Sequence, residues 1–133
     1  MEELFKNHIR SKKLLDQNKM YLLAISGGID SVCLGYLLRS SGIGFAIAHV
    51  NFGLREKESD GDEAFVRSLA KEWRVELHLI NTNIEELDER GGSLQMAARE
   101  FRYEWFDQVL KYNGYASILV AHHADDQLET IFL

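Results

Sequence analysis

A glycine turn near residue 27 carries the side chains and amides best suited to bind a charged ligand. The apolar run 20–25 leads directly into two adjacent glycines, and a predicted helix follows. Paired glycines let the backbone approach a ligand closely, and the free N–H groups and dipole at the start of a helix favour an anion. Five residues of this turn are candidate phosphate ligands: Ser26, Gly27, Gly28, Asp30 and Ser31.

The turn differs from the lysine-containing loop of kinases and GTPases. No Gly-Lys-Ser/Thr sequence follows the glycines, which disfavours that chemistry. A plain strand-to-helix turn is the alternative to a phosphate site.

A second polar cluster, His122 to Thr130, follows the predicted strand 116–121. A helix that starts near Ala124 would place the carboxylates of Asp126 and Glu129 one turn apart. Two carboxylates ~4 Å apart repel by about 4 kcal/mol at an effective dielectric near 20, so a cation between them is expected. Magnesium fits best, because it combines carboxylates with phosphate oxygens.

Two other interpretations of this cluster remain open. Zinc binding by His122 and His123 is disfavoured, because neighbouring residues do not easily share one ion and no third soft ligand is near. An acidic N-terminal helix cap would account for Asp125, but it explains neither the paired histidines nor Glu129.

The predicted helix 93–113 carries two arginines, Arg99 and Arg102, beside its apolar stripe. Guanidinium groups suit a phosphate or a developing oxyanion. Ion pairs with Glu100 or Glu104 are the alternative, and spacing alone does not decide between them.

Apolar runs of strand length alternate with helical spacing along the whole chain. The predicted strands are 20–25, 43–50, 75–80 and 116–121, and the predicted helices are 2–16, 30–40, 61–73, 93–113 and one that starts near Ala124. Such alternation predicts an α/β fold in which a doubly wound parallel sheet lies between two helix layers. Ligands in this architecture bind at the carboxyl ends of the strands, where the strand order reverses. The first and fourth strands should therefore end side by side.

The core stripes follow from residues spaced three or four apart. In helix 61–73 they are Phe65, Val66, Leu69, Ala70 and Trp73, and in helix 93–113 they are Leu94, Ala98, Phe101, Trp105, Val109 and Tyr112. The single cysteine, Cys33, is interpreted as a small buried hydrophobe.

Composition limits the class of protein. The 133 residues are 46% hydrophobic and 27% charged, which suits one domain with a buried core. One cysteine excludes an intrachain disulfide and a multi-cysteine metal centre. No secretory signal or membrane-length apolar run is present, so a cytoplasmic setting is the default expectation. The net charge of −6 is the wrong sign for binding nucleic acid unaided.

Four segments in order resemble the tRNA(Ile)-lysidine synthase family of N-type ATP pyrophosphatases. They are Ile25–Ser31, His49–Arg55, Ser93–Tyr103 and His122–Thr130. The resemblance implies that residues 1–133 form a PP-loop ATP-binding catalytic domain with a Rossmann-like, adenine nucleotide alpha-hydrolase-like fold, cut short at its C-terminus. It implies an enzyme that uses ATP to adenylate the wobble cytidine of tRNA(Ile) and then joins L-lysine to it.

Carried over by position, the resemblance assigns roles to particular residues. The turn residues Ser26, Gly27, Gly28, Asp30 and Ser31 hold the phosphates of ATP, with His122 beside them. Ala48 and His49 lie near adenine. Arg102 stabilises charge on the reacting groups, and Asp126 and Glu129 hold Mg²⁺ and orient the lysine amine.

The sequence departs from the family at two positions and leaves other functions open. Phe52 stands where many relatives have a second histidine, and Met96 where glutamate is frequent. The tRNA contacts are expected mainly from regions outside these residues, and a homodimer is one open assembly. A tRNA thiolation enzyme is disfavoured by the lone cysteine. A nucleotide-binding module without catalysis, similar to universal stress proteins, would not need Arg102 and the two acids together.

Overall fold

The computed structural model describes residues 15–25, 29–53, 56–83, 94–121 and 128–131. Five strands form one sheet in the order β3-β2-β1-β4-β5. The strands are β1 (Met20–Ala24), β2 (Gly44–Asn51), β3 (Leu77–Asn81), β4 (Ile118–Ala121) and β5 (Leu128–Ile131). The helices are α2 (Ile29–Ser40), α3 (Glu56–Trp73) and α5 (Leu94–Asn113).

The predicted doubly wound parallel sheet is present in the first four strands. β1 pairs in parallel with β2 on one side and with β4 on the other, and β2 pairs in parallel with β3. The chain therefore winds outward from β1 to β3 and then crosses to β4 on the opposite side of β1. The strand order reverses between β1 and β4, as expected.

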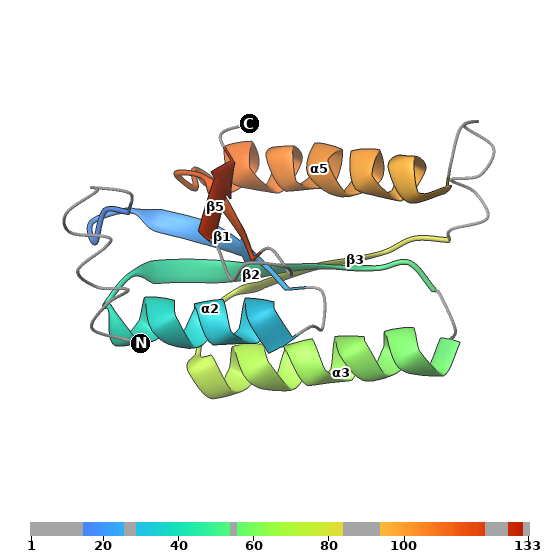
Figure 1. Cartoon of the computed structure of the whole chain (residues 1–133), viewed down its shortest axis with the longest axis horizontal. Helices are drawn as coiled ribbons and strands as arrows, with labels where there is room; N and C mark the ends of the chain where they lie inside the picture. The colour runs from blue at the N-terminus through green and yellow to red at the C-terminus, as the bar shows by residue number, and fades with distance from the viewer. Residues whose placement is uncertain (1–14, 26–28, 54–55, 84–93, 122–127, 132–133) are drawn as a thin grey trace.

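Helices cover both faces of the sheet, with α2 and α3 on one face and α5 on the other (Figure 1). The sheet can pack against helices on both faces because successive side chains of a strand point to opposite faces. In β1, Leu23 packs in the layer of α2 and α3, whereas Leu22 packs in the layer of α5. Both side chains are fully buried, so each layer has its own apolar core.

α2 and α3 approach each other at a glycine. A Cβ atom on Gly35 would lie 2.4 Å from Cη2 of Trp73, so only glycine leaves room for the indole there. Trp73 is buried against Phe45 and Tyr36, and the guanidinium of Arg39 lies over its ring.

The C-terminal part of the chain corrects one prediction. Residues 128–131 form strand β5, antiparallel to β4, where a helix from Ala124 was expected. The free edge of β4 offers backbone groups for pairing, and the β-branched residues Thr130 and Ile131 favour a strand. The expected opening helix, 2–16, lies outside the described residues apart from its last two positions.

Some predicted core positions are exposed. Tyr112 is 91% exposed, and Phe65 and Cys33 also lie at the surface. Phe106 and Leu110 of α5 are buried instead. None of the described helices is long and apolar enough to cross a membrane.

Candidate functional site

The carboxyl ends of β1 and β4 lie side by side, because the two strands are parallel neighbours. Leu22 pairs with Ile118 and Leu23 with Leu119, so both chains run toward the same edge of the sheet. The candidate turn follows β1 at this edge, and the polar cluster that begins at His122 follows β4. The strand arrangement therefore brings the ends of β1 and β4, which precede these two segments, to the same edge.

The backbone that leads into the turn is held by β2. The amide of Ile25 donates to the carbonyl of Ala48 over 3.0 Å. Nδ1 of His49 lies 2.6 Å from the carbonyl oxygen of Ile25. Since a carbonyl can only accept, this ring nitrogen must carry the hydrogen. The last residue before the turn is thus fixed through both its N–H and its C=O.

Both predicted adenine neighbours are inaccessible in this conformation. Ala48 has no exposed surface, and His49 is 4% exposed. Their visible contribution is to position Ile25 and the turn that follows it. Both residues lie inside β2, which continues to Asn51. Their hydrogen bonds to Ile25 join segments far apart in the chain and are not visible in local spacing.

The phosphate-binding candidates are described only in part. Asp30 is half-buried in the first turn of α2, and Ser31 is buried beside it. Ser26, Gly27 and Gly28 lie outside the described residues.

The predicted metal ligands are also described only in part. Asp126 lies outside the described residues, whereas the backbone of Glu129 pairs with Val120 in the β4–β5 ladder. His122, which is predicted beside the phosphates, also lies outside the described residues. The expected helical spacing between Asp126 and Glu129 is therefore wrong, because Glu129 belongs to a strand. Leu128 pairs with Ala121, so β5 starts at the carboxyl end of β4. Among the described residues, no three His, Cys, Asp or Glu side chains form a metal-binding group.

Arg102 lies against the end of β2. Its Cζ is 5.3 Å from the centroid of the Phe52 ring, and Phe52 is the first residue after β2. Burial lowers the pKa of Arg102, and the nearby charge of Arg99 acts in the same direction. Arg99 itself lies over Tyr103, at 4.9 Å from the ring centroid.

The structure adds Asn51 to the residues that shape this edge. Its Oδ1 accepts from the amide of Gly53 at 2.9 Å, and its Nδ2 donates to Glu63 of α3 at 3.1 Å. Its backbone carbonyl accepts from Thr82, beyond the end of β3. The signal was present in the sequence, since Asn-x-Gly after a strand is typical of a turn closed by the asparagine side chain.

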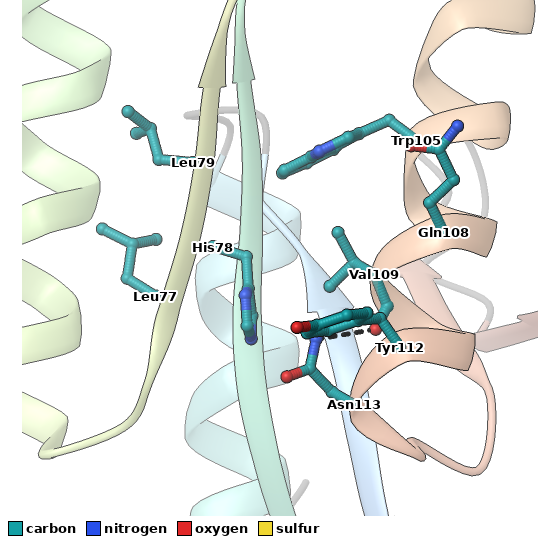
Figure 2. A pocket seen from close by; sticks show the side chains of 8 residues that line it. All are labelled: Leu77, His78, Leu79, Trp105, Gln108, Val109, Tyr112 and Asn113. Atoms are coloured by element: carbon teal, nitrogen blue, oxygen red, sulfur yellow. Dashed lines mark hydrogen bonds between the residues drawn. The ribbon is translucent and has the colours of Figure 1, made fainter.

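Two surface hollows lie away from the carboxyl edge. One, of about 520 Å³, lies between β3 and α5. Figure 2 shows His78 on the same side of β3 as Trp105 and Tyr112, with Leu77 and Leu79 pointing to the other side. The second lies near Met20 and Ala116, at the amino ends of the strands. Neither position is the expected ligand edge of a parallel sheet.

Comparison with known proteins assigns the family. The profile of the PP-loop domain matches residues 1–133, the whole chain. The chain belongs to the PP-loop domain family. Its fold agrees with that assignment: an NH3-dependent NAD synthetase from Campylobacter jejuni superimposes with a TM-score of 0.56 at 19% identity, covering 90% of this chain and 53% of that chain.

Several curated relatives of this PP-loop domain are named tRNA(Ile)-lysidine synthase. A tRNA(Ile)-lysidine synthase from Porphyromonas gingivalis is 46% identical over 127 residues, which cover 94% of this chain and 28% of the relative. The tRNA(Ile)-lysidine synthase from Bacteroides thetaiotaomicron is 41% identical over 93% of this chain and 29% of its own length. The PP-loop domain described here thus spans less than a third of the relatives that it matches.

Proposed function

We propose that this PP-loop domain is the ATP-binding and catalytic part of a ligase that converts the wobble cytidine of tRNA(Ile) to lysidine. The observation that carries the proposal is the 46% identity, across 94% of this chain, to a protein with that name. The adjacent carboxyl ends of β1 and β4 support it, because one ligand can reach the segments that follow both strands.

The proposed reaction has two steps. The 2-carbonyl oxygen of cytidine attacks the α-phosphorus of ATP, the bond to the bridging oxygen breaks, and pyrophosphate leaves. The neutral ε-amine of lysine then attacks C2, and AMP leaves with the former carbonyl oxygen. A carboxylate accepts the proton that the amine loses.

The residues of the chain divide between these steps. We assign the phosphates to Ser26, Gly27, Gly28, Asp30 and Ser31, with His122 beside them, and we place adenine near Ala48 and His49 at the end of β2. Arg102 provides positive charge where the oxyanion develops.

Asp126 and Glu129 are the proposed ligands of Mg²⁺, and one of them is the proposed base for the lysine amine. Glu129 lies in the strand that starts at the carboxyl end of β4, and carboxylate oxygens are ligands that this ion prefers. Bound there, Mg²⁺ would offset the negative charge of the phosphates.

The remaining substrates and the assembly are part of the same proposal. Because the chain has a net charge of −6, most tRNA contacts should come from the rest of a longer protein. We propose a cytoplasmic homodimer, and light scattering on the full-length protein distinguishes it from a monomer.

The direct test uses the full-length protein with radiolabelled lysine, ATP and a tRNA(Ile) transcript. We expect label in the RNA that requires ATP, together with release of AMP and pyrophosphate. A transcript with uridine at the wobble position is the matched control and should stay unlabelled. Absence of label from the cytidine transcript contradicts the proposal, and incorporation from a sulfur donor instead would identify a thiolation enzyme.

A further inference from the structure

Arg102 is a half-buried cation without an ion pair among the described residues. Its contact there is the ring of Phe52, 5.3 Å from Cζ. Burial disfavours the charged form of a guanidinium, and Arg99 one turn earlier adds repulsion. Tyr103 acts in the opposite direction and favours the charged form. Within the part of the chain that the structure describes, no carboxylate compensates the charge, and the group in contact with the guanidinium is the Phe52 ring.

An aromatic ring provides that compensation without neutralising the cation. The negative face of the ring attracts a guanidinium by about 0.5–2 kcal/mol, most strongly where water is excluded. A carboxylate partner would instead occupy the N–H donors and cancel the charge that a reacting group needs. The ring contact leaves Arg102 positively charged and able to donate hydrogen bonds.

Phe52 is itself held firmly. It is 7% exposed, and its ring meets Phe101 edge to face with the centroids 6.1 Å apart. Gly53 follows with a φ of 69°, a conformation that favours glycine, and its amide is bound by Asn51. The ring therefore has one well-defined place at the end of β2.

The position of the Phe52 ring matters because α5 is a long helix, and the ring contact determines where the Arg102 guanidinium lies. Arg102 belongs to the third turn of α5, and its contact with the first residue after β2 keeps the guanidinium at the carboxyl edge of the sheet. An arginine side chain has several rotatable bonds, and holding it in advance removes the entropy cost of ordering it during the reaction.

We propose that Phe52 is a positioning residue, whose ring holds the Arg102 guanidinium charged and oriented at the carboxyl edge for the reacting oxyanion. The inference rests on the proposed function for the identity of that oxyanion. The contact itself does not depend on the substrate.

The test replaces Phe52 in the full-length protein and measures lysine incorporation. Phe52→Leu should lower kcat about 10-fold, the equivalent of 1.4 kcal/mol, with the KM for ATP unchanged. Phe52→Tyr should restore kcat, because the ring is kept. A drop in kcat that tyrosine does not rescue overturns the proposal.

Phe45→Leu is the matched control. Phe45 is equally buried in β2 and also meets a ring edge to face, but its partner is Trp73 on the other side of the sheet. The Phe45→Leu variant should lose as much stability as Phe52→Leu does, but it should keep the kcat of the wild type. Equal kcat values for Phe52→Leu and Phe45→Leu overturn the proposal.

Fluorination of the ring at position 52 is a second test, which can be used if the Phe52→Leu variant does not fold. Fluorine atoms on the ring at position 52 weaken its negative face with little change in shape, so kcat should fall stepwise from phenylalanine to pentafluorophenylalanine. A kcat that does not change with fluorination overturns the proposal.

A spectroscopic measurement separates this inference from the proposed function. The Nε–H proton of Arg102 should show an upfield ring-current shift in wild type that Phe52→Leu removes and Phe52→Tyr keeps. If wild type shows the shift but no lysine enters tRNA, the proposed function fails while the contact stands. Active wild type without the shift overturns the inference alone.

Discussion

Glu63 is a carboxylate that accepts hydrogen bonds from an amide and from a cation. Nδ2 of Asn51 donates to it at 3.1 Å, and Nε of Arg67 donates at 3.2 Å. Both bonds favour the charged form, so they lower the pKa of Glu63, with the Asn51 bond as the larger cause. This pair links α3 to the end of β2, where Phe52 begins the turn.

The titration of Glu63 should reflect these contacts. Asn51→Ala and Arg67→Ala should each raise the pKa of Glu63 toward its usual range, because each removes a hydrogen bond to the carboxylate. A lowered folded pKa gives stability that is present above the unfolded value and is lost as the pH falls through the folded value. NMR titration of the carboxyl carbon measures the pKa. An unchanged pKa in Asn51→Ala would contradict the assignment.

Removal of the Arg102 guanidinium should affect the reaction far more than the fold. Arg102→Ala should lower kcat for lysine incorporation by about 10²–10³, the usual loss when one donor to a developing oxyanion is removed. Arg102→Lys should restore little, because an ammonium lacks the planar fork of donors.

Arg39→Ala is the control for this substitution. Arg39 also lies over an aromatic ring, the indole of Trp73, but on the opposite face of the sheet. It should lose stability and keep kcat. If kcat falls equally in Arg39→Ala, the effect of Arg102→Ala is one of folding.

The three described helices end in the same backbone conformation, but α3 has an arginine where α2 and α5 have glycine. The amides of Ile43, Val75 and Tyr115 each bond to a carbonyl five residues earlier, which closes the last turn. The residue before each of these has positive φ: Gly42 at 71°, Gly114 at 74° and Arg74 at 57°. A side chain in this conformation costs about 1 kcal/mol relative to glycine.

Arg74→Gly should therefore stabilise the protein by about 0.5–1 kcal/mol, and Gly114→Ala should destabilise it by a similar amount. Gly61→Ala is the matched control, because Gly61 is inside α3 and the added Cβ would meet no atom within 4 Å beyond its own helical backbone and its chain neighbours. Alanine there should stabilise by up to about 1 kcal/mol. Urea unfolding measures all three. A loss of stability in Arg74→Gly would show that the arginine side chain outweighs the backbone strain.

The sequence predicted the positions of the strands better than it predicted which side chains of α5 face the core. Each predicted strand up to residue 121 overlaps an observed one, because a parallel sheet needs continuous apolar runs. In α5, aromatic residues occur on several sides, so spacing alone could not tell that Phe106 faces the sheet and Tyr112 faces solvent. Only packing against the strands decides this.

The sequence could predict those features of the candidate site that depend only on the order of the strands. The meeting of the β1 and β4 ends follows from alternation of strands and helices and is confirmed. The roles of Asn51 and Phe52 depend on side chains from distant segments, and β5 depends on a free strand edge. Such contacts between distant parts of the chain are not visible in local spacing.

At the scale of the whole molecule, the two apolar layers share the strands that separate them. Leu22 and Leu23 are neighbours in β1 but pack in different layers. Neither layer can open without exposing a strand that the other needs. The 133-residue chain should therefore unfold as one cooperative unit.

The two tryptophans test this cooperativity, because Trp73 reports on one layer and Trp105 on the other. In Trp73→Phe and in Trp105→Phe, the remaining fluorescence and the far-UV circular dichroism should give the same urea midpoint. Separate midpoints for fluorescence and circular dichroism within either variant would reveal layers that unfold independently.

The contact between Phe52 and Arg102 also bears on how such proteins diverge. A mutation that exchanges the ring for an aliphatic side chain would leave a desolvated cation uncompensated, so selection should remove it while the arginine is retained. Positions 52 and 102 should then be inherited as a pair across descendants. Aliphatic residues at the first position are expected in lineages that have also lost the second.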